Sequence, residues 1–552
     1  MRPEGRPAMA EKSYDYVIVG AGSAGCTLAR RLTEDRDVRV ALIEAGGWDR
    51  DPWLKIPLGW GRILERRLHD WMYFTEPEEN ANGRRIECAR GKVIGGSSSI
   101  NAMAYVRGNP GDYDRWAAAG LQGWSYADVL PYFRRQETWE GGAGPYRGGD
   151  GPLTVGTARY ADPLIEACLD AGRALQLPAT PDYNGAQQEG IGRIQQTIRR
   201  GRRCSAAEAY LRPALGRPNL TVLTGALASR IVLERGRAVG VEYDRRGTAG
   251  VARAEREVIL SGGVINSPQL LMLSGIGDPA ALRAHGITVA AELPGVGQNL
   301  QDHLSVLADY ERRGQGPFVG MMRLDRVVLS LVQAYCFGTG PAAETPSGWT
   351  GFVKSRPDVE LPDIQFLFRA APGGAGPYLP PFKGAFADGF ALRAVMLRPE
   401  SRGEVTLASA DPKVPPRIHQ NFLATEGDRR TIRDGLKLVR RIVGAAPLKD
   451  FVARELAPGA DKQSDADLDA YIRATAATAH HPLGTCKMGP ASDKMAVVDP
   501  ELRVNGVEGL RIVDASVMPD LVGGNINAPV IMIAEKAADL IRGRAPPTAV
   551  AA

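Results

Sequence analysis

Residues 14–25 read Tyr-Asp-Tyr-Val-Ile-Val-Gly-Ala-Gly-Ser-Ala-Gly and contain the clearest structural signal in the chain. The first six residues are mostly β-branched or aromatic, as in a buried strand. Residues 24–32 then carry apolar side chains at helical spacing. Between the two, Gly20, Gly22 and Gly25 form a Gly-x-Gly-x-x-Gly motif, whose glycines permit a tight turn, the close approach of a pyrophosphate and the packing of helix on strand. The stretch predicts the start of a dinucleotide-binding βαβ unit.

A second strand and an acidic residue complete this unit. Residues 38–43 read Val-Arg-Val-Ala-Leu-Ile and lead to Glu44, which lies 19 residues after Gly25. A carboxylate at this place binds a ribose hydroxyl of the dinucleotide. NAD and FAD both present an adenosine diphosphate to such a unit, so the motif alone leaves both open. We expect the cofactor-binding residues of this unit to be Gly20, Gly22, Ser23, Ala24, Gly25, Glu44 and Ala45.

The composition is that of a soluble globular protein. The chain has 552 residues, enough for three to four folding units, with 44% hydrophobic and 24% charged residues. Its 68 Lys and Arg exceed its 63 Asp and Glu by five, and the basic residues are interleaved with acidic ones. Because the short basic clusters lack aromatic partners between them, we predict no nucleic-acid binding.

The cysteine pattern and the amino terminus indicate a reducing location. The six cysteines are scattered without a Cys-x-x-Cys pair or a short Cys/His spacing, so neither a disulfide framework nor a metal site is predicted. Residues 1–13 contain no apolar run of the kind that a secretory signal needs. The apolar window 258–277 is interrupted by glycines and Pro268 and is a poor membrane span. We expect a cytoplasmic protein.

Other parts of the chain show strands without the βαβ rhythm. Residues 362–368 and 390–397 are candidate strands in a region rich in Gly/Pro loops. Near the carboxyl terminus, residues 529–542 have the pattern of an apolar helix, and we expect Lys536, Asp539 and Arg542 on its outer side. The middle region therefore predicts a separate lobe.

Two further glycine-containing segments indicate an extended cofactor. Residues 90–103 combine a glycine pair with hydroxyl and amide side chains, as in a loop that wraps a second section of a cofactor. Residues 262–277 form a glycine turn, an apolar helix and a Ser-Gly-x-Gly end. Three further segments follow them along the chain, namely residues 293–303, 480–489 and 513–529.

Together these segments resemble the glucose-methanol-choline (GMC) oxidoreductases, flavoenzymes that oxidise alcohols with FAD. Residues 90–103 and 262–277 look like the two signature patterns of that family, and the resemblance runs from about residue 14 to residue 542. The most similar branch is that of the bacterial alcohol and choline dehydrogenases. The resemblance selects FAD as the cofactor.

The resemblance implies an α/β fold with two domains: a discontinuous Rossmann-like FAD-binding domain and an α+β substrate-binding domain with an antiparallel sheet. We assign residues 14–303 to the FAD-binding domain with inserted loops, and part of residues 155–200 to the substrate lobe. Residues 304–479 form the substrate-binding domain. Residues 480–544 return to the FAD-binding domain and carry the catalytic histidine and asparagine.

The expected chemistry needs a base beside the reacting hydroxyl. Oxidation of an alcohol transfers a hydride to flavin N5 and a proton from oxygen, and histidine is the side chain best suited to take that proton near neutral pH. By resemblance, His481 is the base and Asn525 is its partner, which hydrogen-bonds the substrate oxygen. His480 is expected to line the substrate pocket. His303 is expected at a domain junction rather than in catalysis.

The resemblance also implies further contacts to FAD. Those near the middle of the cofactor and the isoalloxazine are Val93, Gly95, Gly96, Ser98, Asn101 and Ala102. Ala228 is expected as a backbone contact to adenine, and the carboxyl-terminal contacts are Asp514, Ala515, Asn527 and Pro529.

Two positions depart from patterns within the family. Ile100 stands where some members bond FAD covalently through a histidine, which predicts a non-covalent, dissociable FAD. Ser305 stands where choline-oxidising members carry a glutamate for the trimethylammonium group. We therefore predict a neutral primary alcohol rather than a cationic one.

The predicted function is FAD-dependent oxidation of such an alcohol to the aldehyde, with electrons passed to a quinone or another acceptor. The alternatives are an oxidase that uses oxygen and forms hydrogen peroxide, a choline dehydrogenase, an FAD-containing hydroxynitrile lyase, and an NAD-dependent dehydrogenase or non-catalytic nucleotide-binding protein. Residues 327–337 are apolar but too short to span a bilayer, so they form either a core helix or a peripheral patch that meets a quinone at the inner membrane. The sequence does not predict the oligomeric state.

Overall fold

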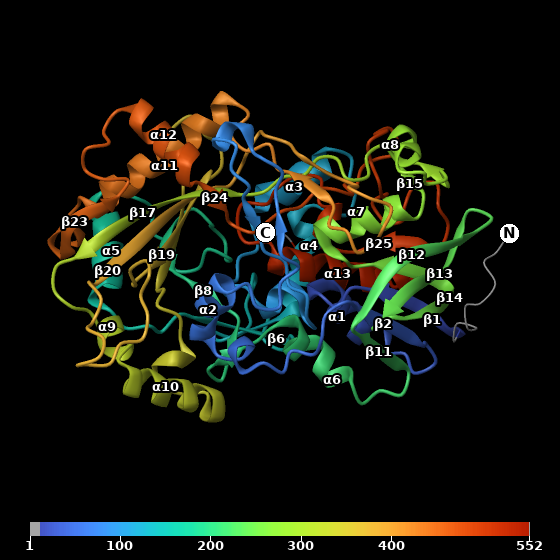
Figure 1. Cartoon of the computed structure of the whole chain (residues 1–552), viewed down its shortest axis with the longest axis horizontal. Helices are drawn as coiled ribbons and strands as arrows, with labels where there is room; N and C mark the ends of the chain where they lie inside the picture. The colour runs from blue at the N-terminus through green and yellow to red at the C-terminus, as the bar shows by residue number, and fades with distance from the viewer. Residues whose placement is uncertain (1–10, 551–552) are drawn as a thin grey trace.

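The computed structural model describes residues 11–550, which form two lobes lying side by side (Figure 1). One lobe is built on a mixed sheet that includes the first strand of the chain, and the other on an antiparallel sheet formed by the middle of the chain. The predicted α/β fold with a second α+β lobe is confirmed. Most of the segment in which a secretory signal was sought, residues 1–10, lies outside the described residues.

The sheet of the first lobe has the order β11-β2-β1-β14-β13-β12. β1 is parallel to both β2 and β14, as the βαβ prediction requires, and the long β14 pairs with β13 in its first half and with β25 in its second. Thus β25, from the predicted carboxyl-terminal return, joins the sheet of the dinucleotide motif. The strands are β1 (Glu11–Val19), β2 (Val40–Glu44), β11 (Leu220–Thr224), β12 (Ala226–Glu234), β13 (Arg237–Arg245), β14 (Thr248–Leu260) and β25 (Leu510–Ile512).

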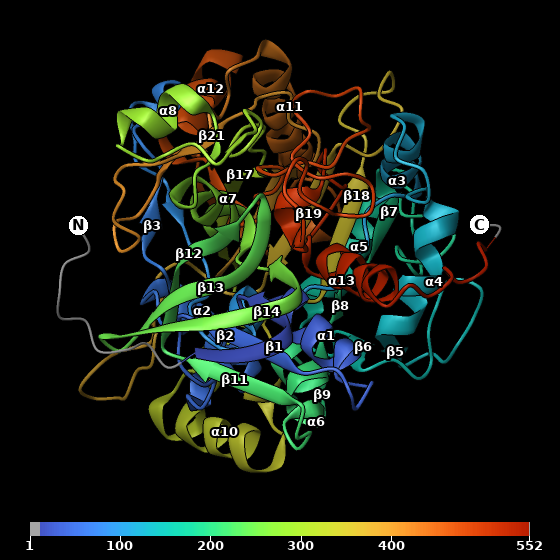
Figure 2. The ribbon, with the colours of Figure 1, turned by 90° about the vertical axis from the view of Figure 1, so that its right-hand side faces the viewer.

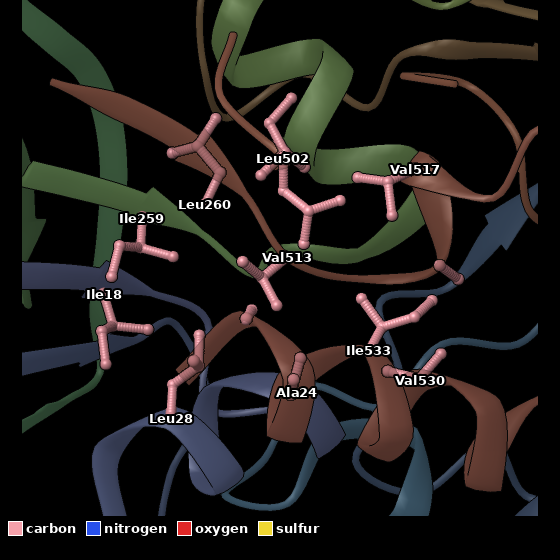
Figure 3. Packing of buried hydrophobic residues seen from close by; sticks show 14 of the residues in the cluster. Ile18, Ala24, Leu28, Ile259, Leu260, Leu502, Val513, Val517, Val530 and Ile533 are labelled. Carbon is pink, nitrogen blue, oxygen red and sulfur yellow. The ribbon is translucent and has the colours of Figure 1, made fainter. Parts of the chain in front are cut away.

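Two helices from opposite ends of the chain cover one face of this sheet. Figure 3 shows Ile18 of the sheet above Leu28 of α1 (Ser23–Leu32), and Ile259 and Ile533 of α13 (Asn527–Ile541) belong to the same buried cluster. The starts of these helices are joined because the Ser23 hydroxyl donates to Asn527 Oδ1 at 2.7 Å. The carboxyl-terminal segment is therefore an integral part of the first lobe.

The expectation that Lys536 and Asp539 lie on the outer side of α13 is wrong. Both side chains are buried. Helix α4 (Tyr126–Gln136) covers that face, where Arg135 forms an ion pair with Asp539 at 2.7 Å and the Lys536 ammonium lies 5.1 Å from the centre of the Trp124 ring. The face of α13 that the helical pattern predicts to be exposed is buried because α4 packs on it.

The second lobe is an antiparallel sheet in the order β23-β17-β20-β19-β18-β7, with β24 beside β17. β7 comes from the segment 155–200, as does helix α5 (Pro163–Ala174). The strands are β7 (Gly190–Arg193), β17 (Leu304–Arg312), β18 (Trp349–Val353), β19 (Ile364–Arg369), β20 (Gly389–Met396), β23 (Val452–Ala457) and β24 (Ala477–Thr478).

The two faces of this sheet have different partners. Side chains alternate between the faces along each strand. Ile364 and Ala394 face the long helix α11 (Glu426–Val443), where a Cβ on Gly435 would lie within 3.2 Å of both. Residues at the intervening positions, such as Leu367 and Arg393, face the first lobe and line the cavity described below. The sheet thus has a hydrophobic core on one face and the cavity on the other.

Shorter elements connect these layers, and in Figures 1 and 2 helix α10 lies at the lower edge of the molecule. Among residues 11–550, none of the helices is long and apolar enough to cross a lipid bilayer. The remaining helices are α2 (Trp60–Glu65), α3 (Pro110–Ala118), α6 (Arg212–Ala214), α7 (Gly263–Leu273), α8 (Pro279–Ala284), α9 (Pro317–Met321), α10 (Leu324–Phe337) and α12 (Asp465–Thr475). The remaining strands are β3 (Tyr73–Phe74), β4 (Glu87–Cys88), β5 (Glu137–Trp139), β6 (Leu153–Thr157), β8 (Gln195–Gln196), β9 (Ile198–Arg199), β10 (Arg202–Arg203), β15 (Ile276–Gly277), β16 (Ala291–Glu292), β21 (Glu404–Thr406) and β22 (Arg417–His419).

Candidate active site

A cavity of about 670 Å³ lies where the two lobes meet. At one end it is lined by the turn between β1 and α1, and at the other by the inner face of β17, β19 and β20. Most of the predicted site residues line it, although they come from distant parts of the chain. They are Gly20, Gly22, Ser23, Ala24, Glu44, Ala45, Gly96, Asn101, Ala102, Ala228, Asp514, Ala515 and Asn527, together with His480, His481 and Asn525.

The predicted cofactor residues that do not line the cavity are Gly25, Val93, Gly95, Ser98 and Pro529. Gly25 lies where helix α1 touches β1, because a Cβ there would be 1.9 Å from the Gly20 carbonyl oxygen. Val93 is fully buried, and the Ser98 hydroxyl donates to the Gly95 carbonyl at 2.6 Å. Pro529 is packed inside α13. These residues lie behind the cavity wall, and their contact with the cofactor stays a prediction.

Glu44 lies at the end of β2, where the ribose contact was predicted. Its Oε2 accepts from the backbone N–H of Ala21 at 2.8 Å and its Oε1 from that of Gly46 at 2.7 Å. Burial raises the pKa of Glu44 to about 7 despite these hydrogen bonds. A carboxylate has about four acceptor positions, so both oxygens can accept further bonds from a ribose hydroxyl.

Gly22 provides a test of whether a nucleotide fits. Its backbone is in the extended region, which any residue adopts, and a Cβ at this position would meet no protein atom within 4 Å. The protein alone therefore does not require glycine here. The space above Gly22 lies at the amino terminus of α1, where N–H groups and the helix dipole favour an anion. The site fits a pyrophosphate.

His481 and Asn525 meet at the other end of the cavity. His481 Nε2 lies 2.9 Å from Asn525 Nδ2, while Asn525 Oδ1 accepts a hydrogen bond from Gln365 Nε2 at 3.1 Å. An amide nitrogen only donates, so His481 Nε2 must present a lone pair. Gln365 thus fixes the orientation of the asparagine, and the asparagine points its donor at the histidine.

His303 determines that the other ring nitrogen of His481, Nδ1, carries the hydrogen. His303 Nε2 lies 3.1 Å from the backbone carbonyl of Leu397, which only accepts, so that nitrogen carries the hydrogen. Burial lowers the pKa of His303 to about 4, and a neutral ring then accepts at Nδ1. His481 Nδ1, 3.1 Å away, must donate to it. Both neighbours select the tautomer of His481 whose lone pair is on Nε2. His303 does not line the cavity but acts on a residue that does.

The surroundings of His481 keep it unprotonated. Burial lowers its pKa well below the usual value for histidine, and His303, His480 and Arg90 lower it further. The backbone N–H of His481 donates to Asp302 Oδ1 at 2.9 Å, which holds the segment against β17. At neutral pH His481 is therefore a neutral imidazole at the cavity wall.

His480 lines the cavity next to His481. Its backbone has a positive φ of 65°, and its carbonyl accepts from Arg90 Nη2 at 2.8 Å. Burial, Arg90 and Arg393 lower the pKa of His480 to about 3, and within residues 11–550 its Nδ1 has no hydrogen-bond partner. The structure thus brings the predicted substrate residue into the cavity as a neutral ring.

The sequence analysis selected none of the arginines that line the cavity, and two of these lie on the inner face of the second sheet. Arg393 on β20 donates to the Ser305 hydroxyl at 3.1 Å, and Arg369 on β19 lies 3.8 Å from Asp309. An arginine within the otherwise apolar run of residues 390–397 is unusual in a buried strand, and this signal was available in the sequence.

A nucleotide cradle and a histidine–asparagine pair that share one cavity define a nucleotide-dependent oxidoreductase. GMC oxidoreductase family models match residues 14–305 and 399–534. An oxygen-dependent choline dehydrogenase of Paraburkholderia phymatum is 47% identical over 546 residues, covering 98% of this chain and 94% of the relative. The mitochondrial choline dehydrogenase of Mus musculus is 46% identical over 550 residues, covering 97% and 90%.

Solved structures agree with these matches. The pyridoxine 4-oxidase of Mesorbium loti has a TM-score of 0.86 at 34% identity, covering 96% of this chain and 100% of that one. A formate oxidase variant of Aspergillus oryzae has a TM-score of 0.87 at 27% identity, covering 97% and 99%. The chain belongs to the GMC oxidoreductase family. It is an FAD-dependent oxidoreductase, and the predicted family and cofactor are confirmed.

Proposed function

We propose that this protein oxidises a primary alcohol to the aldehyde with His481 as the base. The observation that carries the proposal is the hydrogen-bond chain from Gln365 to Leu397, which puts the lone pair of His481 on Nε2, where the Asn525 amide donates to it at the cavity wall. When bound, FAD supplies the hydride acceptor at N5. The lone pair supplies the acceptor for the hydroxyl proton.

The protein groups act on the oxygen of the substrate. In the proposed complex the substrate hydroxyl replaces the direct hydrogen bond between Asn525 Nδ2 and His481 Nε2, donating to the histidine and accepting from the asparagine. His481 then takes the proton, and its Nδ1–H stays bonded to His303. Asn525 holds the oxygen as its charge develops, which is the role of an oriented donor in such sites. Asn525 does not accept the proton, so a single base serves the reaction.

The proposed alcohol carries no positive charge. Choline is the alternative, because relatives that are 46–47% identical are named choline dehydrogenases. Support for a neutral alcohol comes from position 305: Ser305 provides no charge for a trimethylammonium group, and its hydroxyl accepts a hydrogen bond from the guanidinium of Arg393. A cation placed beside Arg393 would be repelled.

The proposal is tested by an anaerobic absorbance spectrum of the holoenzyme. Neutral primary alcohols of matched size are expected to bleach the flavin, with an apparent affinity about tenfold or more above that for choline, because like charges a few ångströms apart in a partly buried site cost on the order of 1–4 kcal/mol. Tighter binding and faster bleaching by choline would contradict the substrate proposal. A flavin that no alcohol bleaches would contradict the oxidation itself and revive the lyase alternative.

We propose that the electrons pass from the reduced flavin to a quinone. Oxygen is the alternative acceptor, because the bacterial relative is named an oxygen-dependent dehydrogenase. Support comes from an apolar face on α10, which we call the α10 face. The side chains of Val328, Leu329, Val332 and Phe337 are 51%, 59%, 50% and 74% exposed, and Phe382 in the neighbouring loop is 88% exposed. Peripheral helices that lie in the surface of a bilayer have such apolar faces.

The charges around the α10 face fit an anionic lipid surface. Arg202 donates to the carbonyls of Tyr335 and Cys336 at 2.7 and 2.8 Å, at the end of the helix. Other exposed basic residues lie in the same parts of the chain, namely Arg199, Arg200, Arg323, Arg326 and Lys383, of which Arg323 forms an ion pair with Asp325 at 2.9 Å. Basic residues around an apolar face add attraction to anionic headgroups of about 1 kcal/mol each. We therefore propose that the α10 face contacts a membrane surface.

Vesicle sedimentation tests this proposal. The holoenzyme is expected to sediment with phosphatidylglycerol-containing vesicles at low salt, and the Leu329→Glu/Val332→Glu variant is expected to lose about tenfold or more in partition while retaining its turnover with a soluble dye. Absence of vesicle binding by the wild type, or a dimer that dissociates in the variant, would overturn it. Stoichiometric hydrogen peroxide during aerobic turnover would favour oxygen over quinone.

A further inference from the structure

The inner face of the second sheet places Arg393 beside the reaction site. Gln365, which bonds Asn525, pairs with Val395 on the central strand β20. Arg393 lies two residues along the same strand on the same face, opposite Leu367. Two residues of strand span about 6.6 Å. The guanidinium of Arg393 is thus carried by the same sheet face as the oxygen-binding groups, but at a separate level of the cavity.

The charge of Arg393 is poorly compensated by the protein. Within residues 11–550 it makes one hydrogen bond, to the neutral Ser305 hydroxyl, and no ion pair within 4 Å. A guanidinium has five N–H donors and stays charged in proteins. Burial and the neighbouring Arg369 lower the pKa of Arg393, and Asp309 raises it. An arginine with free donors in a cavity is available to a ligand.

Other charged groups of the cavity do not supply the missing partner. Asp309 is 3.8 Å from Arg369, which also donates to the Ala371 carbonyl. The carboxylates Glu44 and Asp514 accept backbone N–H bonds at the nucleotide end, so Glu87 is the acidic residue that lines the substrate end. The arginines that line the cavity are Arg84, Arg85, Arg90, Arg369 and Arg393. The substrate end therefore carries an excess of positive charge.

We propose that Arg393, with Arg369 beside it, binds an anionic group of the substrate, a carboxylate, at the end opposite to the reacting hydroxyl. Guanidinium and carboxylate match as paired, charge-assisted hydrogen bonds. Leu307 and Leu367 lie level with Arg393 on the neighbouring strands and suit an aliphatic chain between the two ends. The substrate class is a hydroxy acid with a primary alcohol. This rests on the proposed alcohol oxidation, and neutral alcohols remain weaker substrates.

Turnover of matched substrates tests the site. We expect 6-hydroxyhexanoate to exceed hexane-1,6-diol in kcat/KM by about 10- to 100-fold, the range given by hydrogen bonds to a charged group. The Arg393→Gln variant is expected to lose this preference, chiefly through a higher KM for 6-hydroxyhexanoate. Arg393→Lys restores the charge and should regain part of the preference. Arg173→Gln removes a surface charge elsewhere and should change neither.

A binding measurement separates this inference from the proposed reaction. Hexanoate and hexanamide carry no hydroxyl, so calorimetric titration of the oxidised holoenzyme measures the subsite without turnover. Hexanoate is expected to bind at least tenfold more tightly than hexanamide, and Arg393→Gln is expected to abolish the difference. Equal binding of the two ligands, or a difference that survives in Arg393→Gln, would overturn the inference. If hexanoate binds through Arg393 while no alcohol reduces the flavin, the subsite stands and the proposed reaction fails.

Discussion

The His481→Ala variant is expected to bind FAD normally but to be reduced by alcohol about 10²- to 10⁴-fold more slowly than the wild type, the contribution of a positioned general base. Of the nitrogens of His481 and Asn525 at the cavity wall, His481 Nε2 is the one with a lone pair that can accept a proton. Its removal leaves the hydroxyl proton without an acceptor at the moment of hydride transfer. Anaerobic stopped-flow absorbance at the flavin band measures the rate directly.

Asn525→Ala is the matched control. This variant keeps the base and the His303 contact but removes the donor that holds the substrate oxygen, which is expected to cost about 10²-fold. The two variants also differ in the pH dependence of flavin reduction, since only His481→Ala removes the titrating imidazole. Flavin reduction in His481→Ala at more than a tenth of the wild-type rate would exclude His481 as the base.

The pH profile of the wild type provides a second readout of the same assignment. The base is active when neutral, and burial with the adjacent His303, His480 and Arg90 lowers the pKa of His481. The neutral form therefore persists to lower pH than for a free histidine, and the acid limb of kcat/KM is expected below pH 6.5, the usual value for histidine. An acid limb well above that value, absent in His481→Ala, would mean that the site is not desolvated in the working enzyme.

The parts of the site that the sequence could predict are formed by residues that lie close together along the chain. The βαβ unit is readable because strand, turn glycines and helix follow one another, and Glu44 ends the next strand. His481 and Asn525 were selected by resemblance to two carboxyl-terminal motifs, and both line the cavity. Local order along the chain is sufficient for such features, since the backbone itself brings the residues together.

The parts that sequence could not predict depend on which elements pack together. Asp539 was expected to face outward because it is a charged residue on an apolar helix. The helical pattern could not show that α4 covers this side chain. The roles of His303 and Gln365 required knowing that β17 and β19 place them on either side of the histidine–asparagine pair. Arg393 is visible in the sequence as a charge within an apolar strand, but its face is fixed only by the register of the sheet.

Gly25→Ala is expected to prevent formation of the holoenzyme altogether, whereas Gly22→Ala should fold and lose FAD. In the helix interior, alanine is favoured over glycine by up to about 1 kcal/mol. That gain is too small at Gly25, where a Cβ would lie 1.9 Å from the Gly20 carbonyl oxygen and the backbone of α1 or β1 must move. Backbone displacement in a packed core typically costs about 1–3 kcal/mol or more.

At Gly22 the same methyl group meets no protein atom within 4 Å, so any loss of function must come from a ligand that occupies that space. The measurements are far-UV circular dichroism for the fold and the absorbance of FAD released by acid precipitation for the cofactor. Wild type is expected to release all of its flavin, because Ile100 offers no side chain for a covalent bond. Gly22→Ala should keep the wild-type spectrum of secondary structure and retain less than about a tenth of the FAD. A full complement of FAD in Gly22→Ala would place the pyrophosphate elsewhere, and a folded Gly25→Ala would show that α1 can shift on β1 without loss of the site.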